Sequence, residues 1–156
     1  MLSEFLVTQL KSTQDFILNT VSSFDEADSN YAPEKDMLTV AQHVYSVAQG
    51  AEWLIAGAMS PDGFDRDYAG MQERVMKCES LEAAVTKLKG AFKNAIQNIE
   101  KKPDDFFLRV LPAPMDADLL NSIIWTFTDH MAHHRGSLAV YARMLGKTPK
   151  PCYDGY

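Results

Sequence analysis

The chain has 156 residues, of which 46% are apolar or aromatic, and a formal net charge of −6. This length fits one compact domain built around a single core. The acidic charge argues against sequence-independent binding of nucleic acid, which depends on lysine and arginine side chains that neutralise phosphates.

Three further features of the sequence limit the class of protein to which the chain can belong. No stretch reaches the ~18 consecutive apolar residues of a membrane span, so no membrane association is expected. The two cysteines, Cys78 and Cys152, lie far apart and predict neither a disulfide framework nor a Cys-x-x-Cys metal site. The first residues lack the basic leader and apolar run of a signal peptide. We therefore expect a cytoplasmic protein.

The first two predicted elements are amphipathic helices. The first runs from Ser3 to about Val21, and a polar loop over 24–36 follows it. Thr39 can cap a second helix that reaches about Met59. The apolar residues that define the first stripe are Phe5, Leu6, Leu10, Phe16, Ile17 and Val21, and those of the second are Val40, Val44, Val47, Ala51, Leu54, Ile55 and Ala58.

The middle of the chain predicts a short helix and then a third long one. The short helix is expected around Met71 to Lys77, in a less regular stretch. Ser80 can cap the long helix, which reaches about Glu100. Its inward residues are expected to be Leu81, Val85, Leu88, Phe92, Ile96 and Ile99.

A fourth long helix follows a connection marked by prolines at positions 103, 112 and 114. It is expected to start after Asp116 or Asp118 and to run to about Leu145. Gly146 then provides the usual signal for the end of a helix, with a proline shortly beyond it.

These four helices predict an all-α fold, a four-helix bundle over 1–146, with an irregular tail over 147–156. Each apolar stripe must be buried against the others, because no helix can bury its stripe alone. No segment shows the strict alternation of a half-buried strand. Two of the connections are long enough to permit a crossover topology.

Three of the four histidines lie within five residues, in the stretch 129-DHMAHHRGSL-138. On a helix advancing about 100° per residue, His134 lies about 30° and His130 about 70° from the centre of the apolar stripe. His133 lies about 130° away and is predicted at the surface or an interface. His43 lies about 70° from the centre of the stripe on the second helix. Three imidazoles can therefore point inward.

The spacing of these three histidines is typical of metal ligands. His130 and His134, four residues apart, lie one above the other on a helix, and His43 would join them from a neighbouring helix. A neutral three-histidine set suits Zn²⁺, Ni²⁺ or Fe²⁺ and leaves coordination positions for water or substrate. The spacing alone also permits histidines that are simply hydrogen-bonded in the core.

Three segments resemble the DinB/YfiT-like family of four-helix bundles. They are TVAQHVYSVAQGAEWL around His43, DHMAHHRGSLAVYARMLG late in the chain, and the closing LGKTPKP. The resemblance spans nearly the whole domain, and it implies a divalent metal held by His43, His130 and His134. It places His133 at a variable, non-ligand position. Ser137 stands where the family usually has glutamine, a departure that leaves the three histidines intact.

The resemblance implies a metal-dependent enzyme acting on a small molecule. Family members include thiol-dependent S-transferases and a mycothiol-dependent maleylpyruvate isomerase. One expectation is therefore a transferase that uses a low-molecular-weight thiol cosubstrate, and the other is a hydrolase that activates water. The alternatives are a non-catalytic metal-binding or ligand-binding bundle and a plain helical interaction module.

Residues around the histidines suggest secondary roles. Ser137 is positioned to bond an imidazole N–H or a substrate, as residues beside metal ligands commonly do. Tyr141 falls on the inward stripe, either as a core tyrosine or with its hydroxyl facing the pocket. Trp53 and Trp125 fall off the inward stripes, and exposed large aromatic residues favour a partner surface, so we expect a homodimer.

Overall fold

The computed structural model describes residues 1–111, 120–151 and 153. Its long helices are α1 (Leu2–Val21), α2 (Val40–Met59), α4 (Leu81–Glu100) and α5 (Ser122–Met144), and its shorter elements are α3 (Tyr68–Met76) and the 3-10 turns η1 (Glu26–Asp28) and η2 (Asp104–Leu108). No strand forms in this part of the chain, so the prediction of an all-α four-helix bundle is confirmed. Within the same residues, no helix has the length and apolar character needed to traverse a lipid bilayer.

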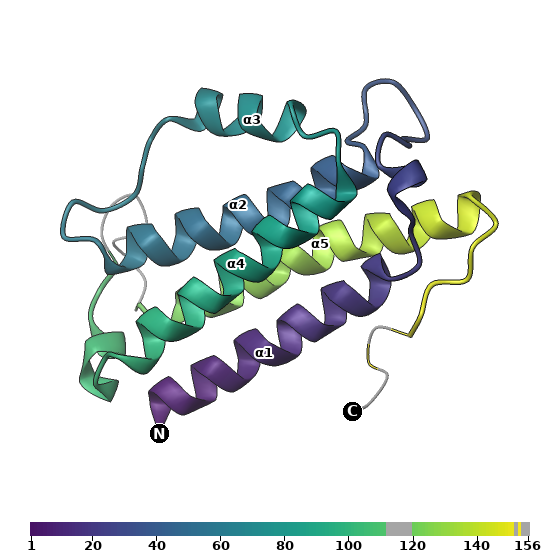
Figure 1. Cartoon of the computed structure of the whole chain (residues 1–156). Coiled ribbons are helices and arrows are strands. Elements are labelled where there is room, and N and C mark those ends of the chain that lie inside the picture. The colour runs from purple at the N-terminus through teal and green to yellow at the C-terminus, as the bar shows by residue number, and fades with distance from the viewer. Residues whose placement is uncertain (112–119, 152, 154–156) are drawn as a thin grey trace.

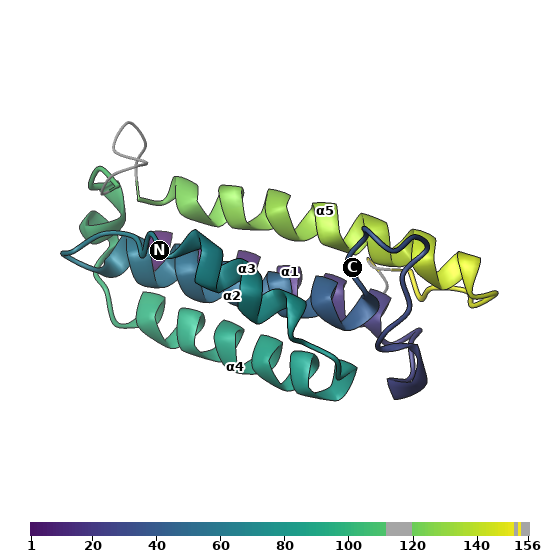
Figure 2. The same ribbon diagram turned by 90° about the horizontal axis from the view of Figure 1, so that it is seen from above.

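The four long helices form a bundle with crossover connections. α2 packs against both α4 and α5, and α1 packs against the same two helices. α1 and α5 run in one direction, and α2 and α4 run in the other (Figures 1 and 2). α3 carries the chain back along α2, which allows α2 and α4 to lie side by side in parallel (Figure 1). α2 and α5 are therefore antiparallel neighbours.

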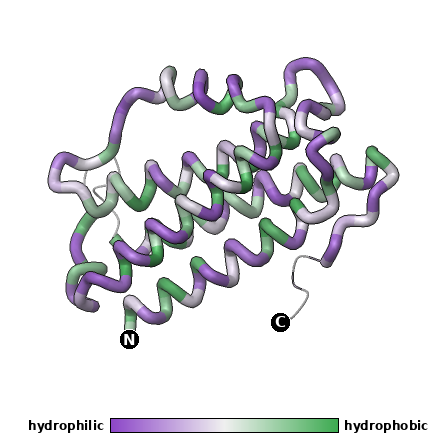
Figure 3. The backbone as a smooth tube through the Cα atoms, viewed as in Figure 1, coloured by the Kyte–Doolittle hydropathy of each residue, from purple (hydrophilic) through white to green (hydrophobic). Residues whose placement is uncertain are grey.

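Each long helix carries apolar residues interspersed with polar ones along its length (Figure 3). The buried apolar residues form one core. On α1 the prediction is wrong for Phe5, which is 58% exposed, whereas Val7 is buried. The buried side of α1 is centred on Leu10 and Ile17, and Phe5 lies about 120° away from it around the helix. Phe16, at the edge of this side, is half-buried and packs edge-on against the ring of Tyr153.

Side-chain caps set the starts of the helices. Thr39 Oγ1 accepts from the Gln42 amide at 3.2 Å, and Gln42 Oε1 accepts from the Thr39 amide at 2.9 Å. This reciprocal pair is a capping box, and it begins α2 at the expected residue. Ser80 likewise begins α4 by accepting from the Ala83 amide at 3.1 Å.

The other helix boundaries differ more from expectation. α3 begins at Tyr68, three residues earlier than expected, because Asp67 Oδ1 accepts from the Gly70 amide at 2.9 Å and caps it. α5 begins at Ser122. The expected starts after Asp116 or Asp118 lie outside the described residues, as do the prolines at 112 and 114 and most of the tail beyond 151.

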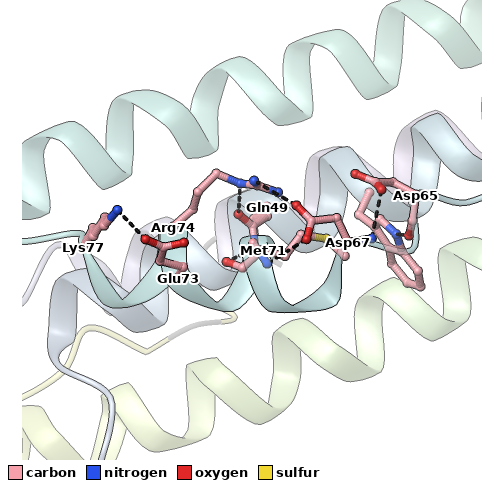
Figure 4. A network of polar contacts seen from close by, with 9 residues as sticks. Gln49, Asp65, Asp67, Met71, Glu73, Arg74 and Lys77 are labelled. Atoms are coloured by element: carbon pink, nitrogen blue, oxygen red, sulfur yellow. Dashed lines mark hydrogen bonds and ion pairs between the residues drawn. The ribbon is translucent and has the colours of Figure 1, made fainter.

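α3 is attached to α2 by polar contacts (Figure 4). The Gln49 side-chain amide donates to the Met71 carbonyl at 2.9 Å, and that of Gln42 donates to the Met76 carbonyl at 3.0 Å. Trp53 donates its ring N–H to the Asp65 carbonyl at 2.6 Å and packs on Phe64. The expectation that Trp53 is an exposed aromatic residue is therefore wrong, because its contacts with Phe64, Asp65 and Tyr68 leave it half-buried.

We expect Thr39→Ala to lower the free energy of unfolding by about 1 kcal/mol, because it removes the side-chain acceptor from the start of α2. Thr39→Ser keeps that acceptor and should stay close to the wild type. Urea denaturation followed by circular dichroism measures both variants. Equal stability of the alanine and serine variants would show that the capping box contributes nothing.

Candidate functional site

The bundle brings together three histidines from α2 and α5. His43 lies in the first turns of α2, and its Nδ1 is 2.8 Å from Nδ1 of His134 on α5. His134 Nε2 in turn is 3.1 Å from Nε2 of His130, one turn earlier on α5. The antiparallel packing of α2 and α5 thus brings His43 within hydrogen-bonding distance of a residue 91 positions further along the chain.

The histidines differ in burial as their helix angles predict. His43 and His134 are each 6% exposed, and His130 is half-buried. His133 is exposed, although its ring still lies edge-on to that of His134, with the centroids 5.3 Å apart. The three inward histidines form one cluster, and His133 stands at its outer side.

Two hydroxyl groups also contact the three histidines. The Tyr141 hydroxyl lies 3.1 Å from the Leu38 carbonyl, to which it donates, and 3.3 Å from His43 Nε2. The Ser46 hydroxyl lies 3.3 Å from His134 Nε2. Tyr141, His43, His134 and His130 therefore form a continuous row of polar side chains in a largely apolar interior.

The proton positions follow from counting donors and acceptors along this row. Because the Tyr141 proton goes to the Leu38 carbonyl, His43 must donate through Nε2–H and accept through Nδ1. His134 then donates through Nδ1–H and accepts through Nε2, to which His130 donates through Nε2–H. This assignment leaves Nδ1 of His130 without a proton, and that atom is buried without a hydrogen-bond partner among the described residues.

All three imidazoles favour the neutral form. Burial, followed by the charge of His133, lowers the pKa of His43 to about 4. Burial, followed by the charges of His130, His43 and His133, lowers the pKa of His134 to about 3. Burial and the charge of His133 also lower the pKa of His130, whereas Asp129 acts in the opposite direction. Near neutral pH each ring therefore has a lone pair for a proton donor or a metal.

The donor set fits a divalent metal in chemistry, but the three rings do not converge. Neutral imidazoles are the usual ligands of zinc and related ions, and the unpartnered Nδ1 of His130 is a free donor atom. However, His134 turns one nitrogen to His43 and the other to His130. Across residues 1–111, 120–151 and 153, no three His, Cys, Asp or Glu side chains form a group arranged to hold a metal ion. At least one ring must rotate before three nitrogens face one point.

The two secondary residues predicted from the sequence have different positions. Tyr141 is 1% exposed, and it is both a core residue and a direct partner of His43. Ser137 donates to the His133 carbonyl in its own helix at 3.3 Å, so its hydroxyl proton is used within α5. Its role beside a pocket stays a prediction.

Sequence reasoning missed Ser46, whose hydroxyl contacts His134. Ser46 follows His43 by three residues, so both lie on the same side of α2. This spacing could have identified Ser46 from the sequence as a neighbour of the histidine cluster.

A separate surface cleft of about 370 Å³ lies beside α3. Its walls include Tyr45, Trp53, Arg74 and Lys87, and none of the three inward histidines lines it. Lys87 is paired with Glu52 at 2.5 Å, so part of the charge in the cleft is already neutralised. The chemistry of the histidine cluster, and not the size of this cleft, identifies the candidate site.

Comparison with known families agrees with the resemblance. The model of the DinB family matches residues 3–156, essentially the whole chain. No curated protein matches the chain.

The depressed pKa of His134 predicts a loss of stability in acid. Between the unfolded pKa near 6.5 and the folded pKa of about 3, the unfolded chain binds a proton that the folded chain does not. The free energy of unfolding should therefore fall as the pH falls from 6.5 toward 4. His134→Gln should make this slope shallower, as measured by urea denaturation at several pH values. His133→Gln is the control and should keep most of the wild-type slope, and an unchanged slope in His134→Gln would contradict the assignment.

Proposed function

The chain belongs to the DinB family, and from this premise we propose that it is a metal-dependent enzyme. In this proposal His43, His130 and His134 hold one divalent ion, such as Zn²⁺, Ni²⁺ or Fe²⁺. The reaction is a thiol-dependent S-transfer or a hydrolysis of a small-molecule substrate.

One observation carries the proposal. Three histidines whose pKa values are all lowered approach one another within 2.8 and 3.1 Å in the interior of the bundle. If these positions served only to stabilise the fold, apolar side chains would give a lower free energy. A buried polar group destabilises the folded state unless it is fully hydrogen-bonded. His130 Nδ1 is not so bonded, so the hydrogen bonds within the cluster do not satisfy all of its polar atoms.

The surrounding residues would orient the ligands. The Tyr141 hydroxyl is fixed by the Leu38 carbonyl and in turn fixes Nε2 of His43, so the Nδ1 lone pair of His43 faces the cluster. Ser46 can donate to Nε2 of His134 and so compete with His130 for that atom. A bound ion would act as a Lewis acid. It would lower the pKa of a bound thiol or water molecule to a value near neutral pH.

A second candidate is a bundle in which the ion only ties α2 to α5. The observation in its favour is the burial of His43 and His134, each of which is 6% exposed. The two functions differ in the behaviour of the metal-free chain. A structural ion contributes directly to folding, so chelation would unfold the protein, whereas a catalytic site allows a folded apo form.

The proposed homodimer rests on Trp125, which is 72% exposed on α5. A large aromatic residue exposed to this extent favours a protein interface. Trp125→Ser should therefore lower the mass measured by light scattering from that of two chains to that of one. A wild-type mass equal to one chain would exclude the dimer.

The metal proposal predicts about one divalent ion per chain. We expect elemental mass spectrometry of untagged protein, reconstituted with each ion in turn, to find this ion in the wild type and in His133→Ala. His43→Ala and His134→Ala should lose it, because each variant removes a proposed ligand. Circular dichroism checks that each variant is folded.

Absence of bound metal in the reconstituted wild type would contradict the proposal, as would equal metal content in all the variants. If the ion binds, chelation followed by thermal unfolding separates the two candidate functions. An assay of the loaded protein with and without a low-molecular-weight thiol then distinguishes the transferase from the hydrolase.

A further inference from the structure

Gly50 lies on α2 opposite the ring of His130 on α5. A Cβ atom built at this position would stand 2.8 Å from His130 Cε1, 3.0 Å from Nδ1 and 3.8 Å from Nε2. Real Cβ atoms essentially never approach a heavy atom more closely than 3.0 Å. The ring of His130 therefore occupies the space that any other residue at position 50 would fill.

The ring cannot move away from α2 without changing the cluster. His130 Nε2 lies 3.1 Å from Nε2 of His134, which is itself held by His43 at 2.8 Å. The rings of His130 and His134 pack edge-on, with centroids 4.6 Å apart. A displacement of His130 would therefore alter its distance or its angle to His134.

We propose that Gly50 is a positioning residue for His130. Its missing side chain lets the Nδ1–Cε1 edge of the ring lie against the backbone of α2, which directs Nε2 toward His134. The consequence for metal affinity rests on the proposed function, whereas the positioning of the ring does not.

Other helical glycines distinguish this role from ordinary helix packing. Gly57, on the same helix, faces the ring of Phe64, 2.2 Å from the position of a Cβ, and so limits packing without touching a histidine. Gly90 on α4 and Gly136 on α5 have no heavy atom within 4 Å of that position. The chain thus offers one control with a steric clash remote from the cluster and two controls without a clash.

The test compares Gly50→Ala with Gly57→Ala, Gly90→Ala and Gly136→Ala. Two readouts are needed. The first is the ¹⁵N chemical shifts of the histidine rings in the metal-free protein, measured by NMR. The second is a titration with Co²⁺, whose visible absorption reports both the affinity for the ion and the geometry of its ligands. Thermal unfolding of each variant records its stability.

We expect Gly50→Ala to change the ring shifts of His130 and to weaken Co²⁺ binding roughly 10- to 100-fold, as the loss of a residue that orients a metal ligand usually does. Gly90→Ala and Gly136→Ala should keep the wild-type shifts and affinity. Gly57→Ala should lower the melting temperature but keep both site readouts. This pattern would separate positioning of His130 from general destabilisation.

Unchanged His130 shifts in a folded Gly50→Ala protein would overturn the inference, whether or not the metal binds. An equal loss of Co²⁺ affinity in Gly57→Ala would also overturn it, because the loss would then follow from destabilisation. If the wild type fails to bind Co²⁺, the metal proposal loses its support, and the ring shifts alone still decide the role of Gly50.

Discussion

The site depends on one constraint, which is that imidazoles inside an apolar bundle need hydrogen-bond partners. His43 and His134 find theirs in each other, and the row continues to Tyr141 at one end and to His130 at the other. Each member restricts the proton position of the next, so the tautomers are set collectively. The single nitrogen left over is Nδ1 of His130. Among the described residues, the hydrogen bonds of the row are therefore incomplete only at that end.

The topology of the bundle makes this arrangement possible. Because the chain crosses the bundle between α1 and α2, α2 becomes an antiparallel neighbour of α5, and the first turns of α2 meet the second half of α5. The capping box at Thr39, four residues before His43, begins α2, so that His43 lies in the first turns of a regular helix. The angle of His43 around that helix relative to the buried residues of α2 directs it toward α5.

The sequence was sufficient for the four long helices in outline and for the choice of inward histidines. Periodicity and caps located α2 and α4 closely, and the helix angle separated the exposed His133 from the buried His134. The prediction failed for Phe5, although its angle of about 120° from the buried side of α1 could have separated it from the apolar stripe. The sequence also could not predict the orientation of the imidazole rings. Which nitrogen of His134 faces His43 depends on side-chain torsions and on packing between α2 and α5, neither of which is encoded in residue spacing.

α3 shows how part of this fold can vary independently of the rest. Its only buried residue is Val75, and α2 holds it through the carbonyl groups of Met71 and Met76, to which Gln49 and Gln42 donate. A main-chain carbonyl is the same in every residue type, so these two hydrogen bonds do not depend on the side chains of α3. Among those side chains, Arg74 donates to Gln49 Oε1 at 3.4 Å and Val75 is buried, so these two contribute to the attachment. Evolution can therefore change the charge and shape of the outer surface of α3 while the interior of the bundle stays as it is.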